Sequence, residues 1–194
     1  MLVENQFYHI YNRGNNSEDI FSDEENYIFF LSKFQYFLKD FINVYSYCLM
    51  PNHFHFLVKI KPDSSNLAKN NSDKMTLTEK AFRDFFISYA KSFNKSQNRT
   101  GSLFQYKFKR KLIDKEAYLK NIVAYIHLNP VRAKLADKAE DWEYSSISHL
   151  VKYKKSLIDL CSDEVLSWFG GIENFIDFHK MYSDIQTERD YLFK

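Results

Sequence analysis

Apolar and polar positions alternate along this chain with two different periods. A period of two, which is typical of strands, predicts extended segments at residues 6–13, 43–49, 53–60 and 102–113. Apolar residues spaced three and four apart predict helices that start at Ser22, run from Thr76 to about Asn98, and cover residues 115–129. Residues 61–75 contain no aromatic residue and many turn formers, so we expect a mobile surface loop there.

Local signals set the ends of the predicted helices. Ser22 followed by Glu25, and Thr76 followed by Glu79, are capping-box patterns, in which both side chains satisfy backbone amides of the first turn. Proline is disfavoured inside a helix, so Pro130 limits the third helix.

The predicted order is strand, helix, strand, strand, helix, strand, helix. This is the order of an α+β, ferredoxin-like split βαβ core, an antiparallel sheet with two helices on one face. The helix over 115–129 is an addition to that core. Residues 137–194 turn acidic towards their end, and we expect a small helical C-terminal appendage there, packed on a core domain of residues 1–136.

The composition indicates a packed, soluble protein. Apolar residues make up 45% of the chain and aromatic residues 18%, so it is not a disordered protein. No run of about 18 apolar residues occurs, which argues against a membrane span. Cys48 and Cys161 lack CxxC spacing, and we expect reduced thiols and a cytoplasmic location.

His53 and His55 are the first candidate site residues. Successive side chains of a strand face opposite sides of a sheet, so both imidazoles share one face and Phe54 lies on the other. Two imidazoles about 7 Å apart along a strand can converge on one cation. Taken alone, the pattern also fits two half-exposed histidines on a sheet.

A second pair of candidates lies on the predicted helix at 115–129. Tyr125 and Asn129 are four residues apart and therefore neighbours on one helix face. An amide oxygen suits hard cations such as Mg²⁺ and Mn²⁺, which makes Asn129 a candidate third ligand. A phenol beside such a cation can act as a covalent nucleophile, although Tyr125 could equally be a packed helix residue.

Positive charge is concentrated in one part of the chain. The net charge of +2 names no partner, but no acidic residue occurs between Asp84 and Asp114. The strand predicted at 102–113 alternates basic and aromatic residues, which fits either nucleic-acid binding or a solvated sheet face. The candidate phosphate-binding residues, which would make affinity depend on salt, are Arg13, Lys107, Lys109 and Arg110.

Two sequence blocks resemble the tyrosine transposases of the HUH nuclease superfamily. Residues 50–57 (MPNHFHFL) resemble their histidine motif, and residues 125–133 (YIHLNPVRA) resemble their nucleophile helix. Residues 7–10 with Arg13 resemble their opening strand, and the resemblance covers about residues 5–150. The later WEYSS and WFG segments, at 142–146 and 168–170, resemble the REP-associated branch of that family.

The resemblance implies a ferredoxin-like fold and an activity in DNA transposition. Single-stranded or hairpin DNA would be cut through a 5′-phosphotyrosine and rejoined, with Mg²⁺ or Mn²⁺ as cofactor. His53 and His55 match the metal ligands and Tyr125 the nucleophile. Asn129 matches the third ligand, where insertion-sequence relatives often carry the longer Gln. Arg132, in the second block, joins the candidates for DNA binding.

Several alternatives remain open at this point. The same residues fit a non-catalytic or domesticated regulator that binds DNA hairpins, and an RNA-directed or replication-initiating enzyme with the same chemistry. Relatives include homodimers with exchanged tyrosine helices, and the sequence does not decide between a monomer and a homodimer.

Overall fold

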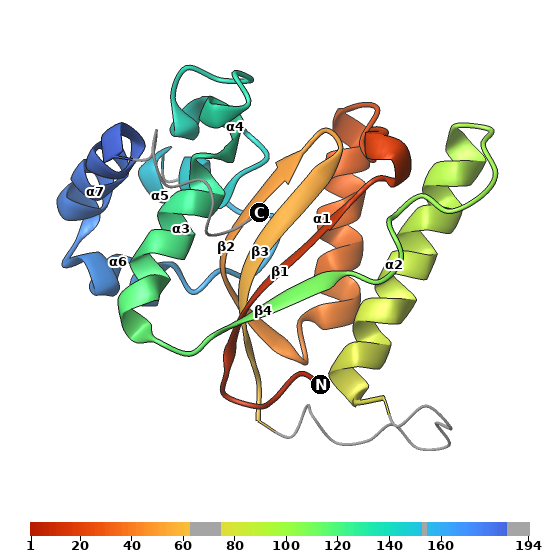
Figure 1. Cartoon of the computed structure of the whole chain (residues 1–194), viewed down its shortest axis with the longest axis horizontal. Coiled ribbons are helices and arrows are strands. Elements are labelled where there is room, and N and C mark those ends of the chain that lie inside the picture. Colours follow the sequence, from red (N-terminus) through yellow and green to blue (C-terminus); the bar gives the residue numbers. More distant parts are fainter. Residues whose placement is uncertain (63–74, 153–154, 186–194) are drawn as a thin grey trace.

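A computed structural model describes residues 1–62, 75–152 and 155–185. One antiparallel sheet with the strand order β2-β3-β1-β4 runs through its centre (Figure 1). Along the sequence, helix α1 (Glu24–Leu38) connects β1 to β2, and helix α2 (Leu77–Ser96) follows β3 and precedes β4. The predicted ferredoxin-like core is confirmed. Its strands are β1 (Phe7–Arg13), β2 (Ile42–Met50), β3 (His53–Ile60) and β4 (Lys109–Ile113).

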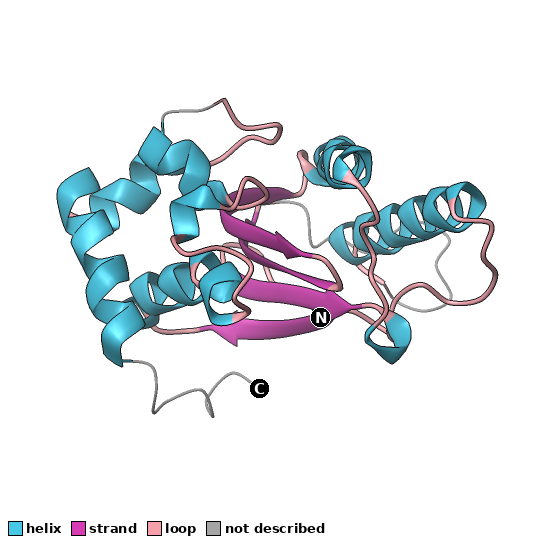
Figure 2. Ribbon diagram, turned by 90° about the horizontal axis from the view of Figure 1, so that it is seen from above, coloured by secondary structure: helices cyan, strands magenta, loops and turns pink. Residues whose placement is uncertain are grey.

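Helices cover both faces of the sheet, as the view from above in Figure 2 shows. Helices α1 and α2 pack on one face. On the other side, α3 (Leu119–His127) contacts β2 and β3. The chain then continues through α4 (Asn129–Arg132), α5 (Ser146–Lys152), α6 (Ser162–Phe169) and α7 (Ile172–Ile185). The C-terminal part is helical where it is described, and the domain boundary after residue 136 stays a prediction.

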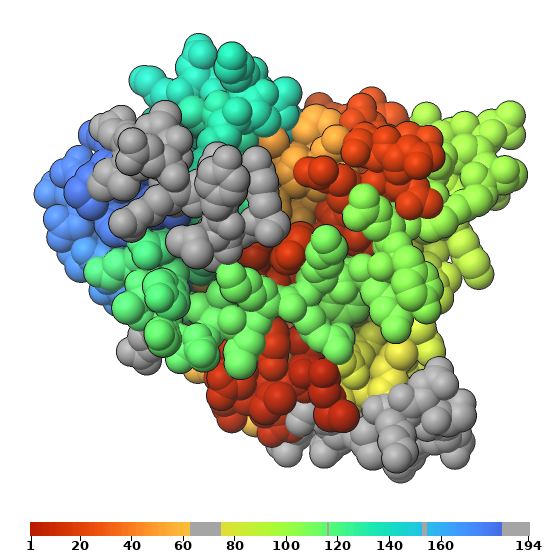
Figure 3. All heavy atoms as spheres, in the orientation of Figure 1, coloured from red at the N-terminus to blue at the C-terminus, as the bar shows by residue number. Residues whose placement is uncertain are grey.

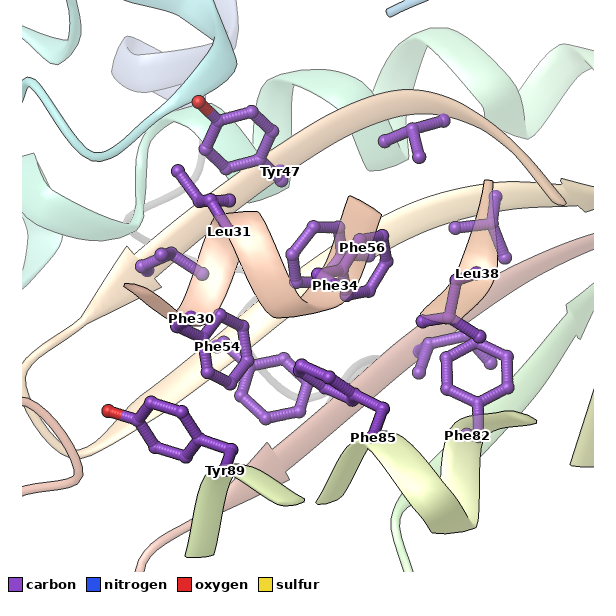
Figure 4. Close-up of a cluster of buried hydrophobic side chains, with 14 of the residues drawn as sticks. Phe30, Leu31, Phe34, Leu38, Tyr47, Phe54, Phe56, Phe82, Phe85 and Tyr89 are labelled. Atoms are coloured by element: carbon purple, nitrogen blue, oxygen red, sulfur yellow. The ribbon is translucent and has the colours of Figure 1, made fainter. Parts of the chain in front are cut away.

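The core between the sheet and helices α1 and α2 is built mainly from aromatic rings (Figure 4). Phe34 of α1 stacks on Phe56 of β3 with 4.1 Å between ring centroids. Phe30 meets Phe85 of α2 edge to face at 4.9 Å. Such pairs contribute about 0.5–1.5 kcal/mol beyond the area they bury. This packing occupies one face of the central strands and leaves the other face for the remaining side chains.

The predicted helix starts are half right. Thr76 and Glu79 form the expected capping box at α2. The cap of α1 is Asp23 rather than Ser22, because the Asn26 amide donates to the Asp23 carboxylate at 2.8 Å. The Ser22 hydroxyl donates instead to the Asn26 side chain. A carboxylate next to the positive end of a helix dipole is the stronger acceptor of the two.

The fourth strand is shorter than predicted. β4 begins only at Lys109, and the preceding residues form one isolated bridge between Gly14 and Phe104. Lys107 has φ 59°, a left-handed conformation that interrupts an extended strand.

The other predicted segments differ in smaller ways. The helix expected over 115–129 consists of a 3-10 turn (Glu116–Tyr118) followed by α3, and Pro130 lies in the first turn of α4. Most of the loop predicted at 61–75 lies outside the described residues. Among the described helices, none has both the length and the apolarity needed to cross a bilayer.

Candidate active site

The pairing register of β1 and β3 brings the predicted site residues onto one sheet face. Arg13 is directly opposite His53, and Tyr11 is directly opposite His55. Residues paired in this way project to the same side. Phe54, between the two histidines, is buried in the aromatic core on the opposite side, as the alternation predicted.

A third histidine, His9 of β1, completes this cluster. His9 Nε2 and His55 Nδ1 form a buried hydrogen bond of 2.9 Å, and the two rings stack. His53 Nδ1 donates to the Asn52 side-chain oxygen at 2.6 Å. The His53 and His55 ring centroids are 5.2 Å apart. In metal-binding histidines one ring nitrogen is commonly held by a second group in this way, which leaves the other nitrogen for the ion.

Burial keeps these three imidazoles neutral. Desolvation, with the nearby Arg13 charge, lowers the pKa of His53 from 6.5 to about 4. Desolvation and then Lys111 lower the pKa of His9 to about 3, and burial also holds the pKa of His55 well below its usual value. A neutral imidazole keeps the lone pair that a cation requires, so His53 and His55 fit a divalent ion at neutral pH.

A cation at this place would need ligands beyond histidine. Within the described ranges, no group of three or more His, Cys, Asp or Glu side chains is arranged to hold an ion. Asn129 starts α4, and its Nδ2 donates to the backbone carbonyls of Tyr125 and Ile126 at 2.8 and 3.3 Å. These bonds satisfy carbonyls at the end of α3 and orient the amide, whose Oδ1 is the atom that would bind a cation. Its role as third ligand stays a prediction.

Tyr125 lies beside the histidines of its own chain. Its ring centroid is 5.6 Å from that of His55 and 5.9 Å from that of His9, edge-on to both. The guanidinium of Arg132 lies 5.1 Å from the Tyr125 ring centroid. One chain therefore brings together the histidine pair and the tyrosine, without a helix from a second copy.

The predicted basic residues divide between the two sheet faces. Lys109 pairs with Tyr11, so it projects to the side of the histidines. Arg110 projects to the α2 side, where its guanidinium forms a 3.1 Å salt bridge with Glu79.

Two further basic positions complete this description. Lys107 is exposed in the segment before β4, whose surface is drawn in green in Figure 3. Lys111, opposite His9, is a second lysine on the site face. The cations that border the histidine face are therefore Arg13, Lys109, Lys111 and Arg132.

A buried polar chain behind Tyr125 has no counterpart in the sequence predictions. His127 of α3 bonds through Nδ1 to His179 Nε2 of α7 at 2.9 Å, and through Nε2 to the Ser146 hydroxyl at 2.7 Å. The Tyr47 amide of β2 donates to the same hydroxyl at 2.8 Å. His179 Nδ1 donates to the Phe175 carbonyl at 2.7 Å. In the sequence, the one local sign of this polar chain is His127, which lies among apolar residues of the helix predicted over 115–129.

Comparisons with known proteins give the family of this chain. The sequence model of the family described as IS200-like transposase matches residues 2–129, which include the histidine pair, Tyr125 and Asn129. A Haemophilus influenzae protein whose name assigns it as a REP-associated tyrosine transposase is 28% identical over 107 residues. That region is 54% of this chain and 58% of the relative, so the chain spans less than two thirds of the relative's length.

The fold also has a counterpart among solved structures. A REP-associated tyrosine transposase bound to a REP hairpin superposes with a TM-score of 0.55 and 14% identity. The match covers 84% of this chain and 93% of the other. At this identity the likeness shows a common fold.

Acid should destabilise the folded protein through the buried imidazole of His179. Burial lowers the pKa of His179 to about 4, against about 6.5 when unfolded, so the unfolded state takes up this proton first as the pH falls. Neutral His179 contributes fully to the free energy of unfolding above about pH 6.5, and this contribution is lost between about pH 6.5 and 4. The loss at pH 5 is about 2 kcal/mol.

Urea unfolding of the wild type and of His179→Gln, at about pH 7 and about pH 5, measures this contribution. The variant should lose about 2 kcal/mol less on acidification, because glutamine does not titrate. Equal losses in the two proteins would contradict the expectation.

Proposed function

Since this chain belongs to the family of IS200-like transposases, we propose that it cuts and rejoins single-stranded DNA with Tyr125 as the nucleophile. The observation that carries the proposal is the position of Tyr125, whose ring lies 5.6 Å from that of His55 in the same chain.

The proposed reaction has two balanced steps. In cleavage, the Tyr125 oxygen attacks phosphorus and its proton is lost, while the bond from phosphorus to the 3′ oxygen breaks and that oxygen leaves as a 3′-hydroxyl. The 5′ end is then held as a phosphotyrosine. In rejoining, a 3′-hydroxyl of DNA attacks this phosphorus and the tyrosine phenol is released. The bond energy stays in the phosphodiester, so no nucleotide cofactor is needed.

The residues around Tyr125 have distinct proposed roles. His53 and His55 would hold Mg²⁺ or Mn²⁺, with Asn129 as third ligand. A bound ion would polarise the scissile phosphodiester and stabilise charge on its oxygens. Asn52 bonds to Nδ1 of His53, and His9 bonds to Nδ1 of His55, so both imidazoles are held in place.

Hairpin DNA is the proposed substrate. The solved relative is described as bound to a REP hairpin, and the cations bordering the histidine face could neutralise the phosphates of such a ligand. Arg13, Lys109 and Arg132 are the nearest candidates, and Lys107 could extend the basic surface. The rings of His55 and Tyr125 are adjacent within one chain, so we propose that a monomer can act on this DNA, and that it does so in the cytoplasm.

A regulator that binds DNA hairpins without cutting them is the second candidate. The placement of Tyr125 against neutral histidines favours the enzyme, because binding alone requires neither group there. Covalent trapping separates the two functions, and matched RNA and DNA hairpins in the same assay test the RNA-directed alternative.

Tyr125→Phe should abolish formation of a covalent protein–DNA adduct and lower cleavage by more than about 1,000-fold, since the attacking oxygen is removed. Hairpins from the DNA flanking the gene, end-labelled and incubated with Mn²⁺, are the substrates, and denaturing gels resolve the adduct. Hairpin binding should persist. Tyr118→Phe, which alters an exposed tyrosine just before α3, is the matched control. A normal adduct from the Tyr125 variant would refute the assignment.

His53→Ala should lose metal-dependent nicking and bind Mn²⁺ much more weakly. Free Mn²⁺ measured by electron paramagnetic resonance gives the affinity independently of activity. Asn52→Ala should weaken Mn²⁺ binding by about 10–100-fold, because it removes the group that orients His53. Full cleavage by His53→Ala in the presence of EDTA would exclude the metal role.

Lys109→Ala should weaken hairpin binding more than Arg110→Ala. These neighbours project to opposite sheet faces, and Arg110 is already paired with Glu79. Loss of one phosphate contact should reduce the slope of log affinity against log salt concentration by about 0.7–0.9. Titration by fluorescence anisotropy at several salt concentrations measures both effects. Equal changes in the two variants would argue against DNA on the histidine face.

A further inference from the structure

We propose that the buried series of hydrogen bonds through Ser146, His127 and His179 positions Tyr125. Helix α7, which carries His179, would then contribute to the active site of its own polypeptide. The inference rests on the proposed role of Tyr125 as nucleophile. His127 and His179 do not touch the reacting atoms and are positioning residues.

The hydrogen bonds of this chain run in one direction. At one end the Ser146 oxygen accepts from the Tyr47 amide at 2.8 Å, and its hydroxyl has two acceptors within reach, the Tyr47 carbonyl at 3.2 Å and His127 Nε2 at 2.7 Å. At the other end the Phe175 carbonyl can only accept, so His179 Nδ1 carries the proton and His179 Nε2 accepts from His127 Nδ1. With both imidazoles neutral, the Phe175 carbonyl thereby fixes both tautomers and makes His127 Nε2 the acceptor for the Ser146 hydroxyl, which is the shorter of the two contacts open to that proton.

This directed chain sets the position of α3 relative to the sheet. It starts on β2, which pairs with β3, where Met50 lies opposite His53 and Cys48 opposite His55. It then crosses α3 at His127, two residues after Tyr125. A slide or rotation of α3 that moved Tyr125 away from the histidines would therefore break bonds on both sides of the His127 ring.

A second contact from α7 reaches the same tyrosine. The Arg132 guanidinium lies 5.1 Å from the Tyr125 ring centroid and 6.0 Å from that of Tyr182 on α7. Helix α7 thus meets the nucleophile helix directly at His127 and reaches Tyr125 through Arg132.

Apolar packing alone would not give this precision. The surrounding cluster joins α3 to α5, α6 and α7 through buried side chains such as Val123, Ile147 and Phe175. Apolar contacts are not directional, and a purely apolar core can lose uniqueness before it loses stability. His127 and His179 are buried polar groups within that cluster, and their bonds are made only in one arrangement.

Two substitutions at His179 isolate its bond to His127. In His179→Gln, the longer amide can place its oxygen where Nε2 lies and accept from His127. In His179→Asn, the shorter amide can reach the Phe175 carbonyl but not His127. His149→Ala is the control, since His149 of α5 is a histidine that bonds to the Tyr47 hydroxyl of β2.

The first measurement is single-turnover cleavage of the labelled hairpin, with hairpin affinity measured in parallel. The Asn variant should cleave about 10–100-fold more slowly at unchanged hairpin affinity, because a small displacement of the reacting group has an effect of this size. The Gln variant and His149→Ala should cleave close to the wild-type rate. Equal losses in the Gln and Asn variants, or no loss in Asn, would overturn the positioning role.

The second measurement, hydrogen exchange of peptides covering Leu119–His127, does not depend on activity. Exchange in α3 should be faster in the Asn variant than in the wild type, the Gln variant and His149→Ala. Unchanged exchange in the Asn variant would overturn the inference even if Tyr125 proves to be the nucleophile. If the wild type forms no adduct but α3 exchange responds as expected, the proposed function fails and the anchoring of α3 stands.

Discussion

In the antiparallel pairing of β1 with β3, the register that buries Phe54 and Phe56 against α1 and α2 also places His53 and His55 on the opposite face. Side chains alternate along a strand, so a slip of one residue would exchange the two sets. The phenylalanines would then meet α3 and the histidines would enter an aromatic core. The hydrophobic burial of one face therefore determines the chemistry of the other.

Desolvation has two consequences on the side of the sheet that faces α3. It keeps His53 and His55 uncharged, which makes them competent ligands for a cation. It also keeps His127 and His179 uncharged, which allows each ring to donate from one nitrogen and accept at the other. His55 of the first pair lies against the Tyr125 ring, and His127 of the second pair lies on the same helix as Tyr125 and bonds to His179 of α7.

Much of this arrangement follows from local sequence patterns. Alternation located the strands, their order gave the fold, and the spacing of His53 and His55 placed both on one face. Local patterns failed where neighbouring groups compete or where the backbone departs from the average. Asp23 displaced Ser22 as a cap, and the left-handed Lys107 shortened the fourth strand.

The bond between His127 and His179 lay beyond such patterns for a different reason. Its partners are 52 residues apart, on helices that meet only after the chain has folded. The side-chain hydrogen bond of His9 to His55, across two strands, was missed for the same reason.

The sheet has two unlike edges. Along β2, bridges to Leu160 and Ser145 occupy part of the outer side, whereas β4 pairs only with β1 among the described strands. An open edge invites strand addition by another molecule, and closely spaced charges are a common protection against it. Lys109, Arg110 and Lys111 occupy that edge. Neutral replacements made to weaken a nucleic-acid contact would therefore also remove protection against aggregation, so a loss of binding in such variants has to be separated from a loss of soluble monomer.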